Sequence, residues 1–263
     1  MNMENETDRK QNLDFILRWL MEDGGESFEI PTSIHEKQKL MRALMNIRPP
    51  KPVSVEFLRA QDVELQAQNK EKGVVKMSDI QNADRDVLLL WQGDITRLQA
   101  DAVVNAANAQ MLGCFSPLHA CIDNCIHSAA GVQLREECEA IMQGGLLPTS
   151  EAVITQGYNL PAKHVIHTVG PIIPNGIPTS EQQIQLADCY RHCLELAEEH
   201  LLQSIAFCCI STGVFRFPNG LAAEIAVRTV RKYLAEHPQT SVRTIIFNVF
   251  LDRDLHIYKS LLS

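Results

Sequence analysis

The chain has 263 residues, of which 45% are hydrophobic and 21% charged, a composition that excludes disordered, collagen-like and fibrous proteins. No apolar run approaches the roughly 20 residues that cross a bilayer, and the polar N-terminus lacks the apolar segment of a secretory signal, so we expect a cytoplasmic protein without a membrane partner. A net charge of -8 argues against a nucleic-acid partner that is held by Lys and Arg on its phosphates.

Residues 1–84 are predicted to form a helical extension. Apolar residues at helical spacing predict one helix through residues 13–20 and a second through residues 34–45. A third helix is expected to begin with Val55, Leu58 and Val63, and its polar continuation over residues 66–73 to be exposed.

Residues 85–263 alternate between β-branched apolar runs and longer helical patterns. The expected strands are residues 87–91, 102–105, 152–155, 164–169, 204–210 and 244–250. The expected helices are residues 118–130, 133–143, 181–200, 221–236 and 254–262. This alternation predicts an α/β domain with a largely parallel sheet between helices, whose ligand crevice lies beyond the carboxyl ends of the strands.

Three loops at these strand ends are rich in small and polar residues. Asp94 follows the first strand, and either binds a ligand or only caps a turn. Asn105 and Asn108 follow the second strand; they either face a ligand or are ordinary turn residues. Residues 211–220 lead from a strand into a helix, a glycine-bearing arrangement whose backbone N–H groups suit a phosphate without any lysine.

Cys114, His119 and Cys121 fall within eight residues, and Pro117 stiffens the turn between them. Two thiolates and one imidazole suit Zn2+, and three protein ligands leave the fourth position open, as in catalytic sites. The spacing is not that of a zinc finger, so the alternative is a buried thiol, an exposed histidine and a helix-facing cysteine.

The other cysteines are expected to be small core residues, since a reducing compartment does not favour disulfides. Cys189 and Cys193 share an apolar helical stripe, and Cys208 and Cys209 lie in an apolar strand. Cys125 lies one turn after Cys121 and would be the fourth ligand of a closed structural site. Cys138 has no histidine near it in the sequence that would suggest a metal ligand. His127 is interpreted as a helix residue that is packed or hydrogen-bonded rather than a ligand.

Five motifs resemble the macrodomain family in order and spacing, over about residues 87–262. They are residues 93–96 (GDIT), 102–108 (AVVNAAN), 126–131 (IHSAAG), 164–171 (HVIHTVGP) and 211–218 (STGVFRFP). The chain is most similar to MacroD-type hydrolases, but residues 113–121 (GCFSPLHAC) replace their glycine-rich stretch. That replacement and the N-terminal extension resemble the zinc-dependent microbial macrodomains that act as protein-ADP-ribose hydrolases.

The resemblance implies a role for each loop. Asp94 would accept a hydrogen bond from adenine with the Ile95 backbone nearby, and Phe250 would either stack on adenine or pack in the core. Asn105 and Asn108 would bind or position the distal ribose. A zinc ion on Cys114, His119 and Cys121 would lie over that ribose. The diphosphate would be wrapped by the backbone of Ser211, Thr212, Gly213, Val214 and Phe215, with Gly213 allowing close approach.

The resemblance further implies hydrolysis of the bond between the distal ribose and a Glu or Asp side chain of a mono-ADP-ribosylated protein. Zinc would either polarise a ribose hydroxyl or lower the pKa of a bound water. Asp123 matches the aspartate that MacroD-type enzymes carry before their Ile-His pair. It either orients a ligand histidine or the attacking water, or is a first-turn helix residue that the dipole favours.

Two other functions fit the same motifs: a reader that only binds ADP-ribose, and a hydrolase of free O-acetyl-ADP-ribose. The resemblance suggests, as the modified protein, a lipoyl-carrier protein that a sirtuin-like transferase modifies. No residue of the sequence encodes that partner.

Overall fold

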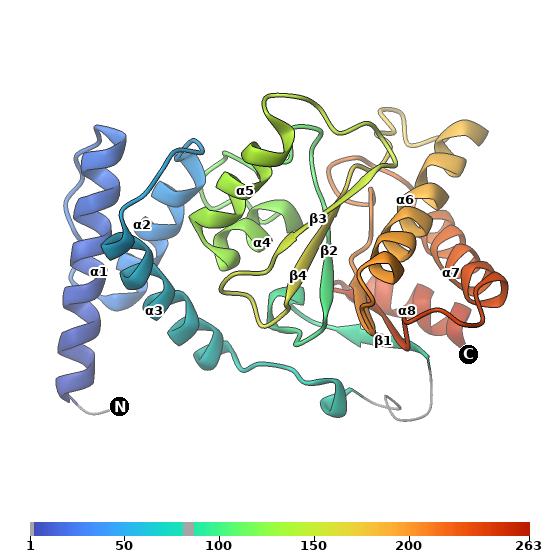
Figure 1. Ribbon diagram of the computed structural model, residues 1–263, viewed down its shortest axis with the longest axis horizontal. Helices are drawn as coiled ribbons and strands as arrows, with labels where there is room; N and C mark the ends of the chain where they lie inside the picture. Colours follow the sequence, from blue (N-terminus) through green and yellow to red (C-terminus); the bar gives the residue numbers. More distant parts are fainter. Residues whose placement is uncertain (1–2, 81–86) are drawn as a thin grey trace.

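A computed structural model describes residues 3–80 and 87–263 (Figure 1). Its helices are α1 (Met3–Gly24), α2 (Ile34–Ile47), α3 (Val55–Lys72), α4 (Ile122–Ala130), α5 (Val132–Met142), α6 (Ser180–Glu199), α7 (Asn219–Glu236) and α8 (Asp252–Leu262), with short 3-10 turns η1 (Met77–Asp79) and η2 (Ile95–Arg97). Its strands are β1 (Leu88–Gln92), β2 (Ala102–Ala106), β3 (Ala152–Gln156), β4 (His164–Thr168), β5 (Ser204–Phe207) and β6 (Thr244–Val249). The expected domain boundary between residues 84 and 85 lies outside the described residues.

The strands form a sheet in the order β1-β6-β5-β2-β4-β3. Every neighbouring pair is parallel except β3 and β4. Helices α4 and α5 cover one face, and α6, α7 and α8 pack against each other on the other (Figure 1). The predicted fold class, a mixed and largely parallel sheet between helices with an N-terminal helical extension, is therefore confirmed.

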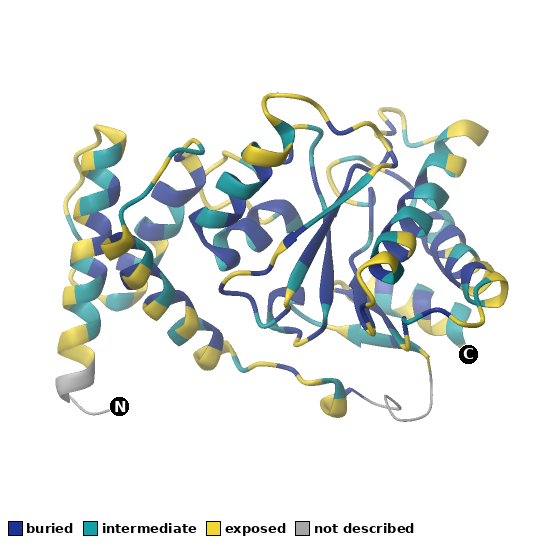
Figure 2. Cartoon of the chain, viewed as in Figure 1, coloured by how far each residue is buried: buried dark blue, intermediate teal, exposed yellow. Residues whose placement is uncertain are grey.

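Buried residues run along the strands and the inner faces of the helices (Figure 2). The interior of β2 illustrates this, since Val103 and Val104 are fully buried between the two helical layers. Burial on both faces is what a central parallel strand requires, and it explains why such strands read as continuous apolar runs.

The helices α1, α2 and α3 share a separate apolar cluster, centred on Leu13, Met41 and Phe57, that reaches the rest of the molecule through Val132 of α5. The prediction that Val55 and Val63 mark the apolar face of α3 was wrong, because they are 57% and 64% exposed. The helix instead buries a face with polar members, including Gln61, Glu64 and Asn69. Such a face is stable because its polar groups are paired, as Arg9 is with Glu64 at 2.9 and 3.0 Å.

Two predicted elements are shorter in the structure. The helix expected from residue 118 begins at Ile122, because Leu118 has a left-handed φ of 57° and Cys121 occupies the cap position. The strand expected to reach residue 210 ends at Phe207. A tight turn follows it, in which the amide of Ile210 donates to Cys208 O. Both differences lengthen loops at the carboxyl edge of the sheet.

All eight cysteines are free thiols. Cys138, Cys189, Cys193 and Cys208 are buried as expected, and burial raises the pKa of Cys189 to about 12. Cys125 and Cys209 are only partly buried. Within residues 3–80 and 87–263, none of the helices combines the length and the apolar character that crossing a membrane requires.

Candidate active site

Because β1, β6, β5, β2 and β4 run in the same direction, their carboxyl ends meet along one edge of the sheet. The predicted loops follow these ends in spatial order. Asp94 comes after β1, Phe250 after β6, residues 211–215 after β5, and Asn108 after β2. The structure therefore lines up the predicted loops on one rim.

At the β1 end of this rim, Asp94 caps η2. Its Oδ1 accepts hydrogen bonds from Thr96 N at 3.0 Å and Thr96 Oγ1 at 2.7 Å, while Oδ2 lies 3.7 Å from Lys72 Nζ. The capping interpretation thus holds for Oδ1, whereas Oδ2 faces the Lys72 ammonium and accepts no hydrogen bond from the described residues. Ile95 is buried, but among the described residues its backbone N–H has no hydrogen-bond partner.

Phe250 follows β6 beside this turn, and Gln92 Nε2 donates to its carbonyl at 3.3 Å. Its side chain is 71% exposed, which excludes the alternative of core packing. An aromatic ring that is open to solvent is a suitable surface for a stacked base.

The loop after β5 presents free amides. Within the described part of the chain, the backbone N–H groups of Gly213, Val214 and Phe215 donate to no partner. The loop is nevertheless fixed, since Phe217 N donates to Ser211 O at 2.9 Å and Ile173 N to Phe215 O at 2.8 Å. A Cβ at Gly213 would meet open space, so this side of the loop is free for a ligand. Successive unpaired amides form a concave anion site that needs no lysine.

At the end of β2, two asparagines hold the carboxylate of Asp123. Asn105 Nδ2 donates to Oδ1 at 2.8 Å, and Asn108 Nδ2 donates to Oδ2 at 3.2 Å. Burial raises the pKa of Asp123 to about 6, although these two hydrogen bonds and the charge of Arg135 oppose the shift. Asp123 therefore lies in the first turn of α4 and is also held by two specific hydrogen bonds.

Asn105 itself is fully buried, so this geometry favours positioning over direct contact with a ligand. Its Nδ2 also lies 3.2 Å from His167 Nδ1, and His167 Nε2 lies 3.0 Å from Thr155 Oγ1. Burial lowers the pKa of His167 to about 3, so the ring is neutral. Sequence reasoning missed this histidine, because only the pairing of β2 with β4 brings it next to Asn105.

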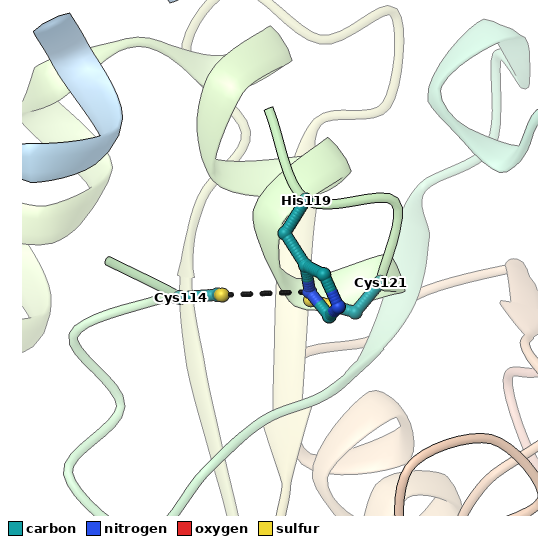
Figure 3. Close-up of side chains that lie close together, drawn as sticks. All are labelled: Cys114, His119 and Cys121. Carbon is teal, nitrogen blue, oxygen red and sulfur yellow. Dashed lines mark hydrogen bonds between the residues drawn. The ribbon is translucent and has the colours of Figure 1, made fainter. Parts of the chain in front are cut away.

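The structure brings Cys114, His119 and Cys121 together on the loop that precedes α4 (Figure 3). Their two Sγ atoms and a ring nitrogen all lie within 4.8 Å of one another, and Cys114 Sγ is 3.6 Å from His119 Nδ1. Zn–S and Zn–N bonds of 2.3 and 2.0 Å at a tetrahedral angle place sulfur and nitrogen about 3.5 Å apart. The donor set and its spacing therefore fit zinc. Cys125 does not join this group.

This loop is held by residues that the sequence did not reveal. Asn124 is fully buried and its Nδ2 donates to Cys114 O at 3.2 Å and to Ser116 O at 2.9 Å. Arg135 Nε donates to Leu112 O at 2.6 Å, and the guanidinium lies 4.3 Å from the centre of the Phe115 ring. The ligand side chains are thus placed by hydrogen bonds to the loop backbone.

A second cluster with metal-ligand chemistry is formed by His127, Cys138 and His167, all buried. Both nitrogens of His167 already lie within hydrogen-bond distance of Asn105 and Thr155, so this ring is engaged in the network around Asn105. His127 packs against the loop, since a Cβ at Gly113 would lie 2.8 Å from its ring. The predicted packing role of His127 agrees with this position.

Comparisons with known proteins agree with the fold. Residues 104–226 match the family model for the Macro domain. The chain is 48% identical to a protein-ADP-ribose hydrolase of Treponema medium, over 97% of this chain and 99% of that protein. This alignment is long enough to include most of the helical extension.

Two solved structures are also similar. The Oceanobacillus iheyensis macrodomain with ADP has a TM-score of 0.59 at 39% identity, over 66% of this chain and 89% of that one. The Trypanosoma brucei macrodomain in complex with ADP-ribose has a TM-score of 0.66 at 30% identity, over 84% of this chain and 95% of that one. From its strand order, its rim and these relatives, the chain belongs to the macrodomain family.

Proposed function

We propose that this protein is a zinc-dependent hydrolase that removes ADP-ribose from Glu and Asp side chains of mono-ADP-ribosylated proteins. The observation that carries the proposal is the order of chemistry along the rim. A base-stacking ring, free amides, a paired carboxylate and a zinc-type donor set follow one another in the same order as adenine, diphosphate, distal ribose and scissile bond.

Adenine would lie at the β1 end. Asp94 Oδ2, which faces Lys72, would accept a hydrogen bond from the exocyclic amine. The Ile95 amide would donate to a ring nitrogen, and Phe250 would stack on the base. The diphosphate would take the amides of Gly213, Val214 and Phe215, and Ser211 and Thr212 would shape the turn that presents them. Backbone donors explain how an acidic chain can bind an anionic ligand.

The distal ribose would lie against Asn108 and Asp123. Asn108 connects the two halves of the site, because its Nδ2 also donates to Gly113 O at 3.0 Å, one residue before Cys114. Asn105 positions Asp123 from the buried side, through its hydrogen bond to Oδ1. In this arrangement Asp123 orients a ribose hydroxyl or the attacking water, and its burial keeps the carboxylate in a single place.

Zn2+, one per chain, would be held by Cys114, His119 and Cys121. When bound it would supply a Lewis acid that polarises a ribose hydroxyl or lowers the pKa of a water. His119 is exposed and the two cysteines are partly buried, so a modified protein would reach this donor set from the solvent. Water adds at the anomeric carbon, the ester bond to the acidic side chain breaks, and ADP-ribose and the free carboxyl group are the products.

The similarity to a protein-ADP-ribose hydrolase of Treponema medium and to a Trypanosoma brucei macrodomain in complex with ADP-ribose supports ADP-ribose chemistry for this chain. As the substrate we propose a lipoyl-carrier protein that a sirtuin-like transferase modifies, and as the location the cytoplasm, where eight free thiols stay reduced.

The test compares three measurements with and without a chelator. They are release of ADP-ribose from a Glu- or Asp-modified protein, hydrolysis of O-acetyl-ADP-ribose, and binding of ADP-ribose. Chelator-sensitive release from the modified protein is the expected result. Binding without release would show a reader instead, and turnover of the acetyl ester alone would show a metabolite hydrolase.

A further inference from the structure

The helical extension touches the loop that carries the three metal-type ligands. This loop, residues 112–121, packs Leu112 against the core at its start, but Phe115 and Leu118 nearer its tip are 38% and 45% exposed. It also contains unfavourable backbone, since Leu118 has a left-handed φ of 57°, which costs about 1–2 kcal/mol for a residue with a Cβ. The shape of the loop must therefore be imposed by its neighbours.

Two of those neighbours are side chains of α2. Asn46 is 1% exposed, and its Oδ1 accepts a hydrogen bond from Leu118 N, the strained residue, at 2.9 Å. Arg42 Nη2 donates to His119 O at 2.9 Å and to Asn124 Oδ1 at 2.8 Å. The first contact fixes the residue before a ligand, and the second fixes the backbone of a ligand itself.

The same two side chains support Asn124, which holds the other half of the loop. The Asn124 amide donates to Cys114 O and Ser116 O, while its oxygen accepts from Arg42. Asn46 Nδ2 donates to Ser128 Oγ at 2.9 Å, and Ser128 Oγ in turn donates to Asn124 Oδ1 at 3.2 Å. These hydrogen bonds form a continuous network from α2 to the backbone of both Cys114 and His119.

The end of α2 is joined to the loop by Arg135. Its Nη1 donates to Met45 O at 3.1 Å and to Asn46 O at 3.0 Å, carbonyls of the last turn of α2, while its Nε donates to Leu112 O. A cation suits the negative end of the helix dipole. Arg135 thus fixes the position of α2 relative to the start of the loop.

We infer that the N-terminal extension is part of the metal site: Arg42 and Asn46 are positioning residues that hold residues 112–121 in the shape in which Cys114, His119 and Cys121 converge. Neither residue touches a ligand atom of His119 or Cys114, so each acts through the loop backbone. The inference rests on the proposed function in that it takes the three converging residues to be zinc ligands.

The experiment measures zinc affinity of the full-length chain by competition with a chromophoric chelator, for wild type and for the variants Arg42→Ala, Asn46→Ala and Arg42→Lys. We expect Arg42→Ala and Asn46→Ala to weaken zinc binding at least about 10-fold, and Arg42→Lys, which keeps a charged donor, to weaken it less. Zinc affinities of both alanine variants within twofold of wild type would overturn the inference.

Two control variants separate a positioning role from general damage to the extension. Arg9→Ala removes the pairing of Arg9 with Glu64 inside the extension, and Lys39→Ala removes an exposed pair with Glu36 on α2; neither residue contacts the loop. Both should bind zinc as wild type does. If Arg9→Ala weakened zinc binding as much as Arg42→Ala, stability of the extension alone would explain the loss, and the inference would be wrong.

Amide hydrogen exchange of the metal-free proteins gives a second readout that does not depend on zinc. The Leu118 amide should exchange slowly in wild type and much faster in Asn46→Ala, with no change in Lys39→Ala. If wild type bound no zinc, the metal part of the proposed function would fail, and exchange at residues 112–121 would still decide whether α2 fixes this loop. Equal exchange in wild type and Asn46→Ala would overturn the inference on its own.

Discussion

The side chain of Asn124 is a sharp test of how the ligand loop is held, and Asn124→Ala is the perturbation. It leaves Cys114 O and Ser116 O without their donor and removes the acceptor of Arg42. A buried polar group that loses its partner costs about 1–3 kcal/mol, and the lower end applies to these part-buried carbonyls. We therefore expect the free energy of unfolding to fall by about 2–3 kcal/mol, which lowers Tm by roughly 5–10 °C.

The assay combines urea denaturation of the metal-free protein with a zinc titration of the folded variant. Asn12→Ala is the matched control, because Asn12 Nδ2 donates to Ala60 O at 3.0 Å inside the extension and touches nothing in the loop. The control should lose about 1 kcal/mol and keep its zinc affinity, whereas Asn124→Ala should lose both. A loss of unfolding free energy below about 0.5 kcal/mol, with zinc affinity unchanged, would show that Asn124 does not hold the loop.

Three further predictions concern other parts of the molecule. Phe250→Ala should weaken ADP-ribose binding about 10-fold, or 1.4 kcal/mol, without loss of stability, because the ring is exposed; calorimetry that shows unchanged affinity would contradict stacking. Cys193→Ser should cost about 1–3 kcal/mol, because it buries a hydroxyl in the core, and should leave kcat unchanged; a large fall in kcat with intact folding would contradict its core role. His167 is neutral when folded, since burial lowers its pKa to about 3, whereas the unfolded chain takes up a proton below about pH 6.5. The contribution of neutral His167 to stability is therefore present above pH 6.5 and is lost towards pH 3, by up to about 1.4 kcal/mol per pH unit. In urea titrations, the free energy of unfolding of His167→Gln should fall less steeply with falling pH than that of wild type, and equal slopes would contradict this.

Much of the fold could be predicted from the sequence because its signals are local. The β2 run is apolar throughout since both faces of the strand are buried, and α2 and α3 begin at Ser33 and Ser54, which accept hydrogen bonds from Glu36 N and Phe57 N. The buried face of α3 could not be predicted in this way. Its polar residues are buried only because partners such as Arg9, distant in sequence, satisfy them.

The candidate site likewise has one part that could be predicted from local sequence and one part that could not. Cys114, His119 and Cys121 are close in sequence, so their spacing already indicated a metal site. Asn46 and Arg135 carry no such signal, because their partners lie on a different helix or in the loop, and only the packing of α2 against α4 and α5 brings them together.

We propose that hydrolysis requires a zinc ion on the loop before α4. The most direct measurement is the metal content of the purified protein together with its activity on an ester-linked ADP-ribosylated protein, for wild type and His119→Ala. We expect about one zinc per wild-type chain, and a folded His119→Ala variant without zinc and without turnover. Full activity in a variant that is demonstrably free of metal would contradict it.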